Sequence, residues 1–249
     1  MASSDAACCV PAPPSDHASS ATGAAGKEER WRDLGVYVVN STNTSAAAVI
    51  LISDVFGWDT PLLRKLADKV SAAGYLVVVP DVLHDDPFKP AETGSPFAAF
   101  PAWLQKHEPL KAVPEIKQII EILKGKSITS IGVAGFCWGA KVAVLLARQK
   151  DIKAAVLLHP SRVVTDDFKE IIAPIAILAA EIDQGTPPSL VKEFRAVLTK
   201  RPEIDSFVKI YPEVAHGWTI RYDRSDKKAV QQADEAHQDM LSWFWKYLK

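Results

Sequence analysis

The chain has 249 residues, of which 48% are hydrophobic and 24% are charged, a composition typical of a globular protein rather than a disordered one. Its 29 basic and 30 acidic residues give a formal net charge of −1, so the charge balance does not favour a nucleic acid or an anionic membrane as a partner. No run of residues approaches the roughly 18 apolar positions that a membrane-spanning helix needs.

The N-terminal segment, residues 1–30, is rich in Ala, Ser, Pro and Gly, and we expect a flexible tail ahead of one domain at residues 31–249. It lacks the apolar stretch behind a basic region that marks a secretory signal. Of the three cysteines, Cys8 and Cys9 are adjacent, and this set cannot form a disulfide framework. These features favour a reducing compartment and therefore a cytoplasmic protein.

Short apolar runs then alternate with helical periodicity. The first apolar strand is predicted at 47–52, and the spacing of apolar residues from Leu62 to Val70 predicts a helix that ends at Gly74. A second buried strand is predicted at 75–79. Further helices are predicted at 112–124, 138–149, 187–199 and 226–248, and further strands at 130–135, 153–158, 174–180 and 206–211.

Residues 84–110 interrupt this alternation. The segment is rich in proline and has little periodicity, which predicts a long loop or lid with short helical pieces. The strands on either side are apolar throughout, which indicates a parallel sheet buried on both faces. Alternating strands and helices predict a single α/β domain, with a mostly parallel, doubly wound sheet and helices on both faces.

The sequence Gly-Phe-Cys-Trp-Gly at residues 135–139 stands between a predicted strand and a predicted helix. This is the nucleophile-elbow pattern Gly-x-Ser-x-Gly with Cys137 in place of the serine. Glycines are needed because a side chain two residues before or after the nucleophile would clash in so tight a turn. The turn also sets the sulfur at a helix N-terminus, which favours the thiolate. A buried structural cysteine in a Gly-rich turn is the alternative.

A catalytic thiol needs a base, and in the fold that carries this elbow a histidine comes last along the chain. His216 follows the strand predicted at 206–211, in a loop at the carboxyl end of that strand, where open α/β sheets place their sites. His237 falls within a predicted helix, and a helix-face role suits it better. His159 could line the site but precedes the expected acid.

The acid is expected after the strand at 174–180. Asp183 is the candidate and Glu181 is its rival, because Asp183 comes later in the loop, from where a carboxylate can reach His216. Such a carboxylate holds the imidazole tautomer and stabilises the imidazolium. A turn or helix-cap aspartate is the alternative.

A second loop, Ser-Asp-Val-Phe-Gly at residues 53–57, follows the first apolar strand. The backbone N–H groups of Val55 and Trp138 are the predicted oxyanion donors. Asp54 is then expected to lie close to the Cys137 sulfur.

Together these motifs resemble the dienelactone hydrolase family of α/β-hydrolases. The resemblance also includes Val-Pro-Asp at 79–81, Glu-Ile-Asp at 181–183 and Ala-His-Gly at 215–217, and it is strongest to plant and other eukaryotic members of the carboxymethylenebutenolidase-homologue type. It implies a Cys–Asp–His triad of Cys137, Asp183 and His216 that opens lactones and esters.

The resemblance also bears on the substrate pocket. In bacterial members a Glu takes the place of Asp54 and is thought to hold the thiol in check, and two arginines hold the substrate carboxylate. Here the first arginine is missing from the segment around His84, and the second is displaced by one residue to Arg221. These departures point away from dienelactone as the natural substrate. The aromatic side chains expected at the pocket rim are Phe56, Trp58, Trp138 and Trp218.

We therefore expect a hydrolase of small esters or lactones that works through an acyl-thioester, with no metal or cofactor, and no oligomer is predicted. One alternative is a non-catalytic hydrolase-fold protein that binds or senses a small ligand in the same pocket. A lesser alternative is a glucan endo-hydrolase, the label of some grass relatives. That reaction needs two carboxylates about 5–10 Å apart, for which Asp54 and Asp183 are candidates, but it gives a cysteine elbow no role.

Overall fold

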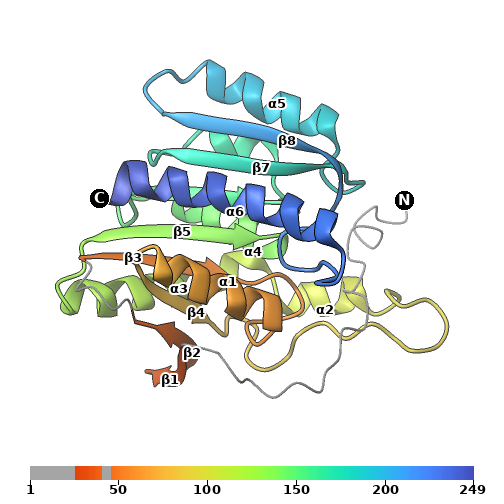
Figure 1. Cartoon of the computed structure of the whole chain (residues 1–249), viewed down its shortest axis with the longest axis horizontal. Coiled ribbons are helices and arrows are strands. Elements are labelled where there is room, and N and C mark those ends of the chain that lie inside the picture. The colour runs from red at the N-terminus through yellow and green to blue at the C-terminus, as the bar shows by residue number, and fades with distance from the viewer. Residues whose placement is uncertain (1–25, 41–45) are drawn as a thin grey trace.

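The computed structural model in Figure 1 describes residues 26–40 and 46–249. Its eight strands are β1 (Lys27–Trp31), β2 (Leu34–Val39), β3 (Ala47–Ile52), β4 (Leu76–Pro80), β5 (Ser130–Phe136), β6 (Ala154–Leu158), β7 (Ile175–Ile182) and β8 (Ser206–Ala215). They form one sheet in the order β1-β2-β4-β3-β5-β6-β7-β8. Six neighbouring strands run parallel to one another, namely β4, β3, β5, β6, β7 and β8. Strand β2 pairs antiparallel with both β4 and β1. The prediction of a mostly parallel α/β sheet is confirmed.

Helices cover both faces of this sheet (Figure 1). Helices α1 (Pro61–Ala72) and α6 (Lys227–Leu248) bury apolar residues against one face. Helices α3 (Pro109–Gly125), α4 (Trp138–Leu146) and α5 (Pro188–Thr199) do so against the other. Because the central strands contribute to both clusters, they are apolar throughout, as expected for a doubly covered sheet. Within the described segments, no helix combines the length and apolar character required to cross a membrane.

The hairpin of β1 and β2 at the sheet edge is not predicted by the sequence pattern. Strand β1 is Lys-Glu-Glu-Arg-Trp and is exposed except at Trp31, so it lacks the apolar alternation that marks a strand. Backbone pairing with β2 from Lys27↔Val38 to Trp31↔Leu34 holds it in place. The chain thus joins the sheet at Lys27, inside the segment predicted as a tail. Residues 1–25, with Cys8 and Cys9, lie outside the described residues.

All strands and helices predicted from residue 47 onward are present, and the differences lie in their ends. Strand β8 continues to Ala215 because it rejoins β7 through the pair Ile182↔Ala215 after an irregularity in the register. This extension contains Pro212, which the ladder tolerates because β8 is an edge strand. Helix α3 begins earlier than predicted, at Pro109, where proline suits the first turn.

The predicted loop at 84–110 contains the short helix α2 (Phe100–Lys106) and a run of packed aromatic rings. Phe100 lies 5.9 Å from Trp103 and Trp103 lies 4.3 Å from His107, measured between ring centroids. Phe88 packs edge-on against Phe100 at 4.9 Å. We call residues 86–107 the aromatic strap. Its packing explains how a segment without periodicity adopts one conformation.

The turn from β5 into α4 is the tightest feature of the fold. Cys137 has φ 52° and ψ −109°, a conformation that non-glycine residues rarely adopt. A Cβ on Gly135 would lie 2.1 Å from the carbonyl oxygen of Gly139, and a Cβ on Gly139 would lie 2.3 Å from the carbonyl oxygen of Ile52. Both glycines are therefore required by backbone contacts. Gly135 meets the turn itself, as predicted from the sequence, whereas Gly139 meets the end of β3.

Gly135→Ala is expected to lower the free energy of unfolding by about 3 kcal/mol or more, because backbone atoms must move to admit the methyl group. Gly125→Ala is the matched control, since a Cβ there meets nothing within 4 Å. The control should leave stability unchanged or raise it by up to about 1 kcal/mol. Urea denaturation of the two variants measures the difference, and equal midpoints would contradict the steric account.

Candidate active site

Polar side chains follow the carboxyl ends of five parallel strands. Asp54 comes after β3, Cys137 after β5, His159 after β6, Asp183 after β7 and His216 after β8. Because the carboxyl ends of parallel strands share one edge, the sheet gathers these residues from distant parts of the sequence. Cys137, Asp183 and His216, the three residues predicted as a triad, therefore lie at the same edge of the sheet.

Backbone hydrogen bonds on both sides hold Cys137. Its N–H donates to the carbonyl oxygen of Leu158 at 3.1 Å, and its carbonyl oxygen accepts from Ala140 at 3.1 Å and Ser161 at 3.0 Å. The thiol is free of disulfides and only 1% of the residue is exposed. Helix α4 starts at the next residue, so its N-terminal dipole favours a negative sulfur.

Asp183 and His216 form a short, oriented pair. One Asp183 oxygen accepts the N–H groups of Gly185 at 2.9 Å and Thr186 at 3.0 Å, and the other lies 2.6 Å from Nδ1 of His216. Since the carboxylate accepts, Nδ1 is the donor, which leaves Nε2 to exchange a proton with another group. The rival acid Glu181 is exposed and accepts the N–H of Glu213 instead.

The surroundings of His216 favour its charged form. Burial, the largest single effect, lowers its pKa, but the Cys137 side chain and the Asp183 carboxylate together outweigh burial and raise the pKa to about 10. An imidazole in this position holds a proton firmly while the sulfur is negative. The pair of Cys137 and His216 can therefore exist as thiolate and imidazolium.

Asp54 and Arg221 form a second buried ion pair beside the first. The Nη1 atom of Arg221 lies 2.8 Å from one Asp54 oxygen, and the other Asp54 oxygen accepts the N–H of Phe56 at 2.9 Å. Burial raises the pKa of Asp54, Arg221 opposes that rise, and the negative charge of Cys137 adds to it. Asp54 thus lies within electrostatic reach of the sulfur, as the sequence predicts. In the described part of the chain, no group of His, Cys, Asp and Glu side chains is arranged to hold a metal ion.

The two predicted oxyanion donors are held by the aromatic strap. Phe88 donates its N–H to the carbonyl oxygen of Val55 at 2.8 Å, and Nε1 of Trp138 donates to the carbonyl oxygen of His107 at 2.8 Å. Among the hydrogen bonds between described residues, none has the backbone N–H of Val55 or Trp138 as its donor outside the regular elements. Both groups remain able to meet a developing oxyanion.

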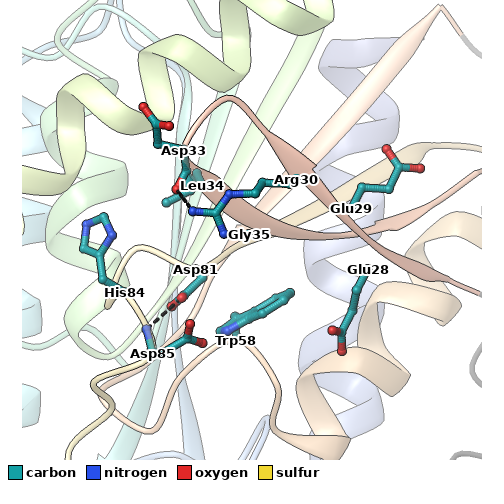
Figure 2. A pocket seen from close by; sticks show the side chains of 10 residues that line it. All are labelled: Glu28, Glu29, Arg30, Asp33, Leu34, Gly35, Trp58, Asp81, His84 and Asp85. Carbon is teal, nitrogen blue, oxygen red and sulfur yellow. Dashed lines mark hydrogen bonds between the residues drawn. The ribbon is translucent and has the colours of Figure 1, made fainter.

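The remaining predicted pocket residues divide into two groups. Phe56 stacks on the Arg221 guanidinium at 5.1 Å, and Trp218 packs 5.5 Å from His159, between ring centroids, and is buried. Trp58 and His84 line a separate cavity of about 600 Å³, bounded by the β1–β2 hairpin and by Asp81 (Figure 2). His84 also lines a smaller cavity of about 140 Å³ together with Trp138. No triad residue lines that cavity.

Sequence reasoning allowed His159 to line the site but did not predict the support that it gives behind His216. His159 is fully buried 5.0 Å from His216, between ring centroids, and its Nε2 lies 2.8 Å from the hydroxyl of Thr219. His237 of α6 donates from Nε2 to the carbonyl oxygen of Thr219 at 2.9 Å. Burial lowers the pKa of His159 well below its usual value and that of His237 to about 4, so both stay neutral. A histidine directly after β6 was the available signal, whereas nothing in the sequence marks Thr219.

Comparison with known proteins agrees with this architecture. A carboxymethylenebutenolidase homolog of Xenopus tropicalis is 31% identical over 91% of this chain and 92% of its own length. A Zea mays protein named endo-1,3;1,4-beta-D-glucanase is 43% identical, but the match covers 67% of this chain and only 52%, about half, of the maize protein. The structure of a putative dienelactone hydrolase from Klebsiella pneumoniae superposes with a TM-score of 0.74 at 20% identity, over 89% of this chain and 98% of that one, and shows the same fold.

The sequence profile of the dienelactone hydrolase family matches residues 34–248, which is nearly all of the described chain. The match includes the strands that carry the elbow and the loops that carry Asp183 and His216. This chain therefore belongs to the dienelactone hydrolase family and is a hydrolase of the class that acts on ester and lactone bonds.

Proposed function

We propose that this protein hydrolyses small esters or lactones with Cys137 as the nucleophile, His216 as general acid and base, and Asp183 as the group that orients His216. The observation that carries the proposal is the buried contact of 2.6 Å between Nδ1 of His216 and an Asp183 oxygen, next to the buried Cys137 of the elbow. The Cys137 and Asp183 side chains both raise the pKa of His216 against the effect of burial. A structural cysteine needs no such partner, whereas a nucleophile does.

The reaction proceeds in two halves. The Cys137 thiolate adds to the substrate carbonyl carbon, and the N–H groups of Val55 and Trp138 hold the oxygen as it becomes negative. The C–O bond to the leaving alcohol breaks, that oxygen takes the proton from Nε2 of His216, and an acyl-thioester remains on Cys137. Water then gives a proton to His216 and attacks the thioester. The acid is released and the thiolate is restored.

A glucan endo-hydrolase, the activity named for the maize relative, fits this site less well. Glycosidic cleavage needs one carboxylic acid that donates a proton and one carboxylate that attacks or activates water. Here both oxygens of Asp54 and both oxygens of Asp183 already accept hydrogen bonds within the protein. Both side chains are also buried, with 1% of Asp54 and 6% of Asp183 exposed. A non-catalytic ligand binder is the remaining alternative, and the first experiment below separates it from the enzyme.

Cys137→Ala is expected to lower the rate of p-nitrophenyl acetate hydrolysis by at least about 10³-fold, because the nucleophile is lost while the fold remains. Nitrophenolate release measures the rate, and intact-protein mass spectrometry after rapid quenching detects the acyl-enzyme in the wild type only. Thermal denaturation of both proteins controls for folding. A variant as active as the wild type would refute the role of Cys137. A separate reaction with an alkylating reagent shows whether the Cys137 thiol of the wild type is reactive. If the thiol is alkylated but the wild type hydrolyses neither this ester nor a dienelactone, the result favours a ligand-binding protein.

The pH dependence of kcat/KM should show an alkaline limb near pH 10, because His216 must keep its proton to protonate the leaving group and its pKa is raised to about 10. Asp183→Asn removes the negative charge that stabilises the imidazolium. The limb should then move to lower pH, and kcat/KM should fall by about 10³-fold or more. Glu181→Gln is the control, since that carboxylate faces Glu213 rather than His216. An unshifted limb in Asp183→Asn would contradict the assignment.

Trp138→Phe is expected to lower kcat by about tenfold with little change in KM, because the Trp138 backbone N–H loses its anchor on the strap at His107. Trp103→Phe deletes a comparable bond within the strap, from Nε1 to the carbonyl oxygen of Asp86 at 2.9 Å. Both variants should lose about 1–2 kcal/mol of stability. Steady-state kinetics on both variants test the difference, and an equal loss of kcat would mean that the strap acts only on overall stability.

A further inference from the structure

The segment that follows β6 holds the Cys137 elbow from both sides. The carbonyl oxygen of Leu158 accepts the N–H of Cys137 at 3.1 Å, and Ser161 donates its N–H to the carbonyl oxygen of Cys137 at 3.0 Å. His159 lies between these two contacts, and its own N–H donates to the carbonyl oxygen of Leu178 in β7 at 2.8 Å. Its φ of 37° lies in the left-handed region, which a residue with a side chain adopts only where its surroundings impose it. The backbone therefore fixes His159 relative to the nucleophile.

The side chain of His159 extends from this segment to the loop that carries His216. Its ring packs edge-on against the His216 ring, with 5.0 Å between the centroids and 67° between the ring planes. Its Nε2 lies 2.8 Å from the hydroxyl oxygen of Thr219, which follows His216 by three residues. Both His159 and Thr219 are completely buried. This side chain therefore joins the two loops on which the proposed nucleophile and its base stand.

Thr219 is held from a second direction by α6. Its carbonyl oxygen accepts the Nε2–H of His237 at 2.9 Å, and only 3% of His237 is exposed. Within the loop, Ile220 donates its N–H to the carbonyl oxygen of Gly217 at 3.0 Å, which closes a turn around Thr219 directly after His216. Because so tight a turn moves as a unit, the two bonds at Thr219 also restrain His216.

An apolar ring at position 159 would pack against His216 without leaving a polar atom unpaired. Burial, and then the charge of His216, lower the pKa of His159 well below its usual value, so its imidazole stays neutral. Its Nε2 is bonded to Thr219, whereas its Nδ1 is buried and has no hydrogen-bond partner among the described residues. A buried polar atom without a partner is destabilising. Stability alone therefore does not explain a histidine here, whereas the need to hold the Thr219 hydroxyl does.

Resting on the proposed function, we propose that His159 and Thr219 are positioning residues that set the separation and angle between the Cys137 sulfur and Nε2 of His216. Neither residue makes or breaks a bond in the reaction, and each acts through His216. The attraction between a thiolate and an imidazolium falls with their separation. Without the bond between His159 and Thr219 the turn relaxes, the imidazolium stabilises the thiolate less, and the geometry for proton transfer is lost.

Thr219→Val removes the hydroxyl and keeps the branched shape of the side chain. On p-nitrophenyl acetate, kcat should fall by about tenfold with KM unchanged, because the loss lies in the alignment of His216 rather than in substrate binding. Thr219→Ser keeps the hydroxyl and should retain most of the wild-type kcat. Tyr37→Phe is the stability control, since it removes a buried hydroxyl that donates to Asp68 at 3.0 Å, and it should leave kcat unchanged. A wild-type kcat in Thr219→Val, or a Thr219→Ser as slow as Thr219→Val, would overturn the proposal.

The reactivity of the thiol gives a second measurement that does not depend on turnover. Iodoacetamide alkylates the thiolate, and peptide mass spectrometry follows the rate at Cys137 at pH 6 and at pH 9 in each protein. The ratio of the two rates reports how well the imidazolium maintains the thiolate at the lower pH. Thr219→Val should lower this ratio by about tenfold, and Tyr37→Phe should leave it unchanged. A purely structural role for Thr219 would leave the ratio at the wild-type value, and that result would overturn the proposal.

A double-mutant cycle tests whether His159 and Thr219 act as a pair. His159→Phe keeps an aromatic ring and removes the same hydrogen bond, so the double variant should keep kcat within about twofold of Thr219→Val alone. Losses that multiply would contradict a shared role. If the larger ring prevents folding, the Thr219 variants and the alkylation ratio decide the question. Failure of the proposed function has a different signature, since Cys137→Ala would then be as active as the wild type.

Discussion

The site depends on the contact between the backbone of α4 and the end of β3. Gly139 lies so close to the carbonyl oxygen of Ile52 that a single added carbon would stand 2.3 Å away. Because the loop with Asp54 and Val55 begins directly after β3, this contact brings the proposed oxyanion donor Val55 and the Asp54 carboxylate toward Cys137. The left-handed conformation of Cys137 persists because the surrounding backbone leaves it no alternative.

Two nearly fully buried ion pairs lie next to this turn, and burial of charge is unfavourable unless it is matched. Removing the partner of a buried charge typically lowers stability by about 3–5 kcal/mol, whereas apolar replacements of such pairs are often neutral. The pairs of Asp183 with His216 and of Asp54 with Arg221 are therefore better explained by the chemistry of the thiol than by stability. In the proposed mechanism, the pair of Asp183 and His216 keeps the proton that the leaving group takes.

The aromatic strap connects both parts of the proposed oxyanion hole. It reaches Val55 through the N–H of Phe88 and Trp138 through the carbonyl oxygen of His107, although these residues lie far apart in the sequence. Stacked rings at Phe100, Trp103 and His107 stiffen it. A segment expected from sequence to be a loop or lid thus forms a wall that can align two backbone donors at once.

The local pattern of apolar and polar residues determined most of the fold. Apolar runs and helical periodicity suffice for β3 to β8 and for the helices between them, because each pattern matches the face that its element buries. The elbow at Cys137 was also predictable from its motif, and the contact of Gly135 with Gly139 is local, whereas the contact of Gly139 with Ile52 depends on how α4 packs on β3. The chain order of acid and histidine then led to Asp183 and His216, which the sheet brings to within 2.6 Å of each other.

Other features were decided only by tertiary structure. The β1–β2 hairpin is held by backbone pairing, and the charged side chains of β1 give no sequence pattern from which this pairing could be predicted. The partner of Asp54 is 167 residues away, and Thr219 is held by His159 and His237 from two different elements. Trp58, although close in sequence to expected site residues, lines a different cavity, and His84 lines both that cavity and a smaller one that it shares with Trp138. Sequence spacing reports which edge of the sheet a residue reaches, whereas the partner of each buried charge depends on how separate loops meet in space.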